Sequence, residues 1–176
     1  AADNVIVTGS FLGTVDFGSG PLTASGADTI LLKLSPAGMH LWSRRSGGSL
    51  GDEGRAVAVD PQGNIVVSGT FNTVVNFGGA ALTSIGGNDV FLAKYTPEGV
   101  HLWSEAFGGL TNFDASSALA VDGAGNILLT GYFARSIDFG TGPLASAGSK
   151  DVFVPGFSPA GVVQWARRYG GTGIDV

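Results

Sequence analysis

The feature that most constrains the fold is an internal repeat with a period of about 61 residues. Residues 88–109 read NDVFLAKYTPEGVHLWSEAFGG, and related segments occupy 27–48 (ADTILLKLSPAGMHLWSRRSGG) and 150–171 (KDVFVPGFSPAGVVQWARRYGG). Each copy contains two β-type runs joined by a Pro-x-Gly turn and ends in a Gly-Gly pair, which is the pattern of a β-hairpin. The chain is therefore predicted to be built from copies of one unit.

Two further runs complete the unit. A β-branched run precedes each hairpin at 4–11, 64–71 and 126–133, and a small apolar run precedes it in turn at 55–60 (RAVAVD) and 117–122 (SALAVD). The links between these runs contain Asp and Gly, which favour short turns and hence antiparallel neighbours. The unit is predicted to be four strands in meander order.

Apolar character falls from the first of the four runs to the last. The first alternates Ala with Val or Leu, whereas the last carries Trp, Ser and charged residues. A blade of a β-propeller has this gradient, because its first strand is buried beside a narrow central channel and its last strand meets solvent. We predict an all-β fold, a β-propeller-type tandem repeat of about three four-stranded antiparallel blades that form part of a larger propeller.

The predicted repeats are 1–51, which lacks its first strand, 52–113 and 114–174, within a single repeat domain or fragment spanning 1–176. Because another first strand should begin where the chain stops, we expect a longer array. The open edges would be covered by further blades of the same protein or by another copy. The long segment between the second and third runs, such as 72–87, predicts a protruding loop or small hairpin in each unit.

Composition agrees with many short strands and excludes several classes of function. There are 30 glycines and only 13% charged residues, so long helices are not expected. A net charge of −5 with scattered arginines argues against nucleic acid and anionic membranes as partners. No apolar run is long enough for membrane insertion, and the absence of cysteine excludes disulfides and thiolate metal sites. No cofactor is predicted.

The motifs form a recognisable set. They are Gly-x-Asp before the third run, Pro-x-Gly in the hairpin, Leu-Trp in the fourth run, Gly-Gly after it, and Val-Asp-x-x-Gly-Asn further on. This set resembles the SBBP (β-propeller repeat) family of exported bacterial proteins over nearly the whole chain. The resemblance implies an extracellular, periplasmic or cell-surface location and no general active site.

The third repeat departs from this pattern. Gly156 stands where the other repeats have Lys33 and Lys94, and Pro155 lies inside the third run. Proline has no backbone N–H to give to a neighbouring strand, so this strand is predicted to be bulged or to lie at an edge.

Catalytic roles are not favoured by the pattern of polar residues. Most acidic residues recur at equivalent repeat positions, which indicates that they build the repeat. His40 and His101 each precede a serine, Ser43 and Ser104, by three positions. In a regular strand, residues i and i+3 point to opposite faces, so no nucleophile–base pair is expected. The histidines are predicted to be solvated or capping, and no catalytic residue is assigned.

Two weak binding signals remain. Asp52, Asp114 and Asp175 follow the Gly-Gly pairs and could form a ring of carboxylates for a cation around a channel, although turn and cap roles are favoured. The tryptophans, which could be sugar platforms, are instead predicted to be buried between neighbouring blades. Their positions are Trp42, Trp103 and Trp165.

The function predicted from these observations is a non-enzymatic scaffold or interaction module of an exported or surface protein, which binds partners through loops at one face. The partner would be a protein or a surface glycan. One alternative is a carbohydrate-binding lectin with three-fold repeats. A second alternative is a non-catalytic part of a larger propeller enzyme.

Overall fold

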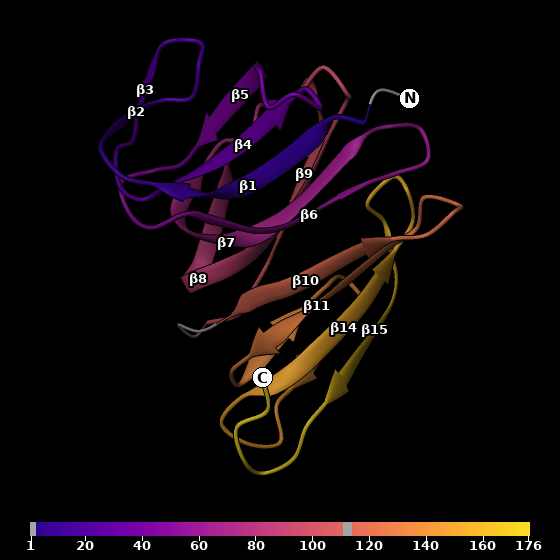
Figure 1. Cartoon of the computed structure of the whole chain (residues 1–176). Helices are drawn as coiled ribbons and strands as arrows, with labels where there is room; N and C mark the ends of the chain where they lie inside the picture. The colour runs from indigo at the N-terminus through magenta and orange to yellow at the C-terminus, as the bar shows by residue number, and fades with distance from the viewer. Residues whose placement is uncertain (1–2, 111–113) are drawn as a thin grey trace.

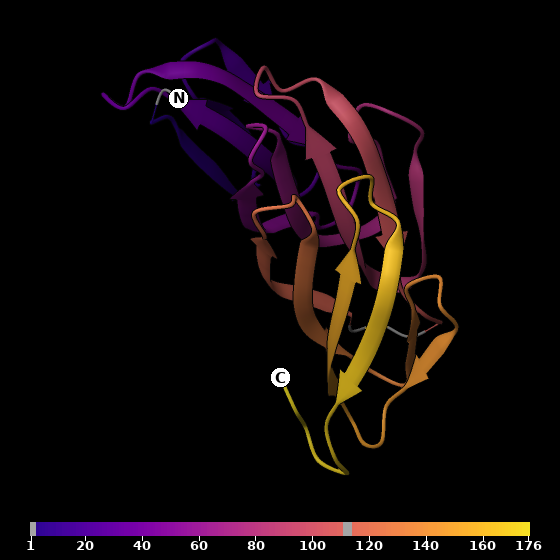
Figure 2. The same ribbon diagram turned by 90° about the vertical axis from the view of Figure 1, so that its right-hand side faces the viewer.

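The computed structural model describes residues 3–110 and 114–176 (Figure 1). These residues form strands and turns with no helix, and so no helix that could span a membrane. The prediction of an all-β fold is confirmed. Three main antiparallel sheets follow one another in chain order (Figures 1 and 2).

The main sheets have three, four and four strands. Sheet 1 contains β1 (Val5–Phe11), β4 (Asp28–Leu34) and β5 (His40–Ser46). Sheet 2 contains β6 (Glu53–Val59), β7 (Ile65–Val75), β8 (Leu82–Tyr95) and β9 (His101–Phe107). Sheet 3 contains β10 (Ala115–Val121), β11 (Ile127–Phe133), β14 (Asp151–Phe157) and β15 (Val163–Tyr169). Strand order within each sheet follows the repeat, as the predicted meander requires.

A small hairpin, here called the arm, protrudes between the second and third strands of each repeat, as the sequence predicts. In the first and third repeats the arms are separate two-stranded sheets. They pair β2 (Thr14–Asp16) with β3 (Pro21–Thr23), and β12 (Ser136–Asp138) with β13 (Pro143–Ala145). In the second repeat the arm continues β7 and β8, with Val75 opposite Leu82.

The placement of Pro155 corrects one expectation. Strand β14 lies between β11 and β15, so the edge position is wrong. Its register shifts between Gly156 and Phe157, but β8 shifts at the equivalent position, between Lys94 and Tyr95, without a proline. The other predicted outcome, a bulge in this strand, is present, but it belongs to the repeat and is not caused by Pro155.

Two apolar clusters lie between consecutive sheets. One joins Leu31 of sheet 1 to Ile65 and Phe91 of sheet 2, and the other joins Leu92 of sheet 2 to Phe153 of sheet 3. Sheet 2 is covered on both sides, so β7 is buried at every position from 65 to 71. Along β11 of sheet 3, buried and more exposed residues alternate instead. This alternation is what a sheet covered on one side shows.

Candidate functional site

The junction between sheets 1 and 2 is built on a turn. In the turn at 96–99, the Gly99 N–H donates to the carbonyl oxygen of Thr96, and Gly99 has a φ of 79°, which suits glycine. The indole of Trp42 lies against this glycine, since a Cβ there would be 3.2 Å from the ring. The Trp42 indole N–H and the Lys33 ammonium both donate to the carbonyl oxygen of Pro97, at 3.2 and 2.6 Å.

The junction between sheets 2 and 3 repeats this arrangement. The ring of Trp103 lies 3.1 Å from where a Cβ of Gly161 would be, and Lys94 donates to the carbonyl oxygen of Pro159 at 2.9 Å. The Lys94 ammonium also forms an ion pair with Asp60 at 2.8 Å, with both side chains buried. One tryptophan and one lysine of each sheet therefore hold the Pro-x-Gly turn of the next sheet.

In sheet 3 the same surface is open. Gly156 replaces the lysine, and the ring of Trp165 lies across it, 2.6 Å from where a Cβ would be. A hollow of about 350 Å³ remains beside them, lined in part by Leu128 and Asp122. Asp122 accepts hydrogen bonds from Asn126 in the way that Asp60 accepts them from Asn64, but the lysine partner is missing.

The tryptophan side chains are more exposed than the sequence analysis predicts. Trp42 and Trp103 are half-buried, and Trp165 is 39% exposed. The first two lie between neighbouring repeats, on the next turn. No described repeat follows Trp165, so nothing covers its outer face. All three tryptophans occupy the same repeat position. Their exposure differs because Trp42 and Trp103 have a following repeat to pack on and Trp165 has none among the described residues.

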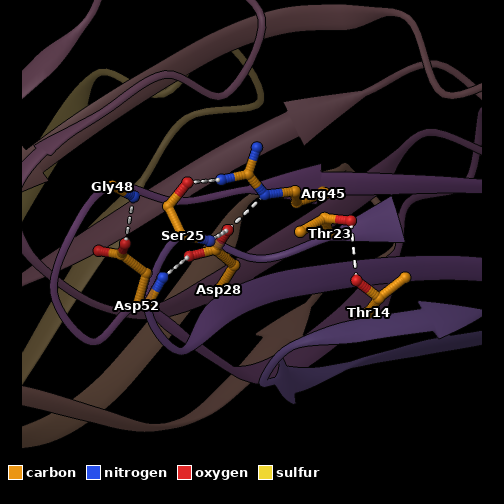
Figure 3. A network of polar contacts seen from close by, with 8 residues as sticks. Thr14, Thr23, Ser25, Asp28, Arg45, Gly48 and Asp52 are labelled. Atoms are coloured by element: carbon orange, nitrogen blue, oxygen red, sulfur yellow. Dashed lines mark hydrogen bonds and ion pairs between the residues drawn. The ribbon is translucent and has the colours of Figure 1, made fainter. Parts of the chain in front are cut away.

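The candidate cation-ring residues hold the Gly-Gly loops, which is the capping role that the sequence favoured. Asp52 accepts a hydrogen bond from the backbone N–H group of Gly48 (Figure 3). It accepts another from the backbone N–H group of Asn72. Asp114 accepts them from Gly109 and Ala134, and Asp175 from Gly171. Residues 3–110 and 114–176 contain no group of three or more His, Cys, Asp or Glu side chains that could hold a metal ion. The geometry assigns these carboxylates to loop capping.

A second buried aspartate lies near each of these carboxylates. In the first repeat Asp28 pairs with Arg45, which also contacts Ser25 (Figure 3). In the third, Asp151 pairs with Arg168. Burial opposes ionisation of Asp151, but hydrogen bonds from Ala147 and Arg168 outweigh it and hold its pKa below the usual value.

The second repeat lacks this arginine. Ala106 occupies the register position of Arg45 and Arg168, so Asp89 has no cation beside it among the described residues. Its Oδ1 is buried without a hydrogen-bond partner, as is the Oδ1 of Asp151. Burial raises the pKa of Asp89. Burial, reinforced by the charge of Asp89, raises the pKa of Asp114 to about 7. Sequence reasoning missed this pair, although the alanine at an arginine position was a visible signal.

The histidines correct another expectation. His40 Nε2 lies 3.2 Å from Ser43 Oγ, and His101 Nε2 lies 3.1 Å from Ser104 Oγ. The strands are bulged between histidine and tryptophan, so the i and i+3 side chains share a face. The argument from regular strand geometry is therefore wrong at these two positions.

These His–Ser pairs nevertheless lack the third member of a catalytic triad. Among the described residues, no hydrogen bond orients Nδ1 of His40 or of His101, which a general base requires. The His101 ring instead lies over the arm, 2.5 Å from where a Cβ of Gly79 would be. Burial lowers the pKa of His101. The geometry is that of a cap on the arm.

Comparisons with known proteins include a distant relative. No family model matches the chain. An uncharacterized WD repeat-containing protein, L264, of Acanthamoeba polyphaga mimivirus is 27% identical over an alignment of 168 positions. The alignment covers 77% of this chain and 12% of that protein, so the chain spans only a small part of its relative.

Among solved structures, a protein of unknown function from Bacteroides caccae aligns with 99% of this chain and 98% of its own length. The identity is 11% and the TM-score is 0.26, so this likeness supports no argument about the fold.

Proposed function

We propose that this chain is a non-enzymatic interaction scaffold of the β-propeller type, in which the three sheets are successive blades. The contact between neighbouring sheets is the main support for this proposal. At both junctions, the Pro-x-Gly turn of one sheet lies on a tryptophan and a lysine of the sheet before it. Arrays of blades depend on such repeated contacts between neighbours. WD repeats build propellers, so the distant WD repeat relative supports the same assignment.

The polar residues support a role in binding over a role in catalysis. The aspartates that follow the Gly-Gly pairs cap loops, and the histidines lie against the arms or a nearby serine. These contacts are repeated from unit to unit. A catalytic site on a repeated scaffold must break the repeat at some point. The acids break it at Asp89 and Asp114, and both of these side chains are buried and do not face solvent.

The arms are the surface proposed to bind a protein partner. They leave each sheet at the end opposite the Pro-x-Gly turn and fold back beside the fourth strand, so that Gly18, Gly78 and Gly140 lie against His40, His101 and Val163. The outer side of each tip is exposed. Each tip is held by a side-chain cap, since Asp16, Asn76 and Asp138 accept hydrogen bonds from the N–H groups of Gly18, Gly78 and Gly140. Pre-formed loops lose less conformational entropy on binding, which favours recognition.

Peptide display tests this assignment. Peptides selected on the immobilised chain should bind a variant altered at the three arm tips at least about ten-fold more weakly, which is about 1.4 kcal/mol. The substitutions are Ser19→Arg, Ala80→Arg and Thr141→Arg. The matched control places arginine at the Pro-x-Gly turns, and should bind like the unaltered chain. Its substitutions are Ala37→Arg, Glu98→Arg and Ala160→Arg.

Two results would contradict the proposal. Equal binding by the tip variant and the control would show that the arms are not the recognition surface. Binding to a glycan array, with no peptide enriched, would favour the lectin alternative.

A further inference from the structure

The back face of each sheet is the side that carries its tryptophan. In sheet 2 this face includes Val66, Val90 and Leu92, which are fully buried against sheet 3. The equivalent residues of sheet 3 are less covered. Leu128 is 43% exposed, and Val152 and Val154 are partly exposed beside Trp165. Sheet 3 therefore presents an open apolar back face.

The front face is the opposite side, which packs against the preceding sheet. In sheets 2 and 3 it includes Ile65, Val67, Ile127 and Leu129, all of which are buried. The equivalent residues of sheet 1 are Val5 and Val7, which are 46% and 41% exposed. Sheet 1 therefore presents an open apolar front face.

The turns show the same asymmetry. Gly99 and Gly161 each lie against a tryptophan ring of the preceding sheet. In the first turn, 35–38, Gly38 has a φ of 75° like its counterparts, but no atom lies within 4 Å of where its Cβ would be. The chain thus carries a turn without a tryptophan and, in Trp165, a tryptophan without a turn.

We propose that the back face of sheet 3 docks the front face of sheet 1 of a second copy, with the 35–38 turn lying on Trp165. The two open faces are the two halves of a junction that occurs twice within the chain, between sheets 1 and 2 and between sheets 2 and 3. A contact between two different surfaces is heterologous, so copies add head to tail.

The proposed contact between copies should be less stable than the junctions inside the chain, for two reasons. Strands β6 and β10 contact the preceding sheet at the internal junctions, and the described residues of sheet 1 include no strand equivalent to them. Gly156 also removes the lysine that would donate to the carbonyl oxygen of Pro36. The inference rests on the stacking of sheets in the proposed function and not on the arms, so its failure leaves partner binding by the arms intact.

Sedimentation velocity with two charged variants tests the proposal. Leu128→Glu blocks the back face of sheet 3, and Val7→Glu blocks the front face of sheet 1. Ile85→Glu adds the same charge at an exposed position of the second arm and serves as the control. Circular dichroism and unfolding midpoints confirm that each variant is folded.

The unaltered chain and the Ile85→Glu control should rise above 17.7 kDa between about 1 μM and 1 mM, while each face variant stays at 17.7 kDa. An equimolar mixture of the two face variants should restore association but stop at pairs, because each keeps one intact face. An unaltered chain that stays monomeric overturns the proposal. So does a face variant that dimerises alone, or a mixture that stays monomeric while the unaltered chain associates.

Discussion

Lys94 of sheet 2 donates a hydrogen bond from Nζ to the carbonyl oxygen of Pro159 in sheet 3, at 2.9 Å. The same ammonium lies 2.8 Å from the carboxylate of Asp60, and its side chain is only 5% exposed. A buried ammonium is costly unless it is paired and hydrogen-bonded. Lys94 meets both conditions, because it is paired with Asp60 and hydrogen-bonded to Pro159. It therefore links Asp60 of its own sheet to the Pro-x-Gly turn of the sheet that follows.

Replacing Lys94 with methionine should lower the free energy of unfolding by about 3 kcal/mol, because Asp60 then keeps a buried charge without its partner. Lys33→Met is the matched control. Lys33 donates to the carbonyl oxygen of Pro97 but forms no ion pair with an acid in the described chain, so its loss should cost only about 1 kcal/mol. Urea unfolding of both variants measures the difference. Equal costs would contradict the assigned role of Asp60.

Stability should depend on pH through Asp114. In the folded chain its pKa is raised to about 7 from 3.8, so between these values the folded state binds more protons than the unfolded state. The stabilisation is complete at low pH and is lost as the pH rises through about 7. The slope reaches about 1.4 kcal/mol per pH unit.

The lowered pKa of His101 changes the stability with pH in the opposite direction, so the total pH dependence does not report on Asp114 alone. The variant Asp114→Asn isolates the contribution of Asp114. The difference in unfolding free energy between the variant and the unaltered chain should therefore change with pH between 4 and 7. Asp175→Asn, at the equivalent position of the third repeat, provides the control. A pH-independent difference for Asp114→Asn would show that this carboxyl ionises normally in the folded state.

Gly161→Ala should be more destabilising than Gly38→Ala. The two glycines occupy equivalent turns with φ of 81° and 75°, so the conformational cost of alanine is about the same, roughly 1 kcal/mol. At Gly161 the methyl group would also lie 3.1 Å from the ring of Trp103, whereas at Gly38 the space is open. Thermal unfolding of the pair measures the extra cost of crowding at the junction. Identical shifts in Tm would contradict the packing described.

Neither Ser43 nor Ser104 should react with a fluorophosphonate probe. Each serine has a histidine within hydrogen-bond distance, but no hydrogen bond to a carboxylate orients either histidine as a base within the described chain, although the charge of Asp16 acts on His40. Mass spectrometry after incubation with the probe checks this expectation, with a known serine hydrolase as positive control. A probe adduct on either serine would contradict the capping role and reopen the case for catalysis.

The repeat period was enough to predict the strands, their meander order and the arms, because turn residues and apolar alternation are local signals. The His40–Ser43 contact could not be predicted, since it depends on a bulge that sequence periodicity does not reveal. The exposure of Trp165 also escaped prediction, because the residue matches Trp42 and Trp103 and only the absence of a described neighbour distinguishes it. Burial is a property of packing partners, which a single repeat does not specify.

The most direct test of the account compares two identical substitutions at one repeat position. Trp103 packs on the turn of the following sheet, whereas no described sheet covers Trp165. At concentrations low enough to keep the chain monomeric, urea unfolding should show that Trp103→Ala lowers the free energy of unfolding by about 3 kcal/mol. The same measurement on Trp165→Ala should give less than about 1 kcal/mol. Equal losses for the two variants would contradict the claim that each repeat is held to the next by a tryptophan and a Pro-x-Gly turn.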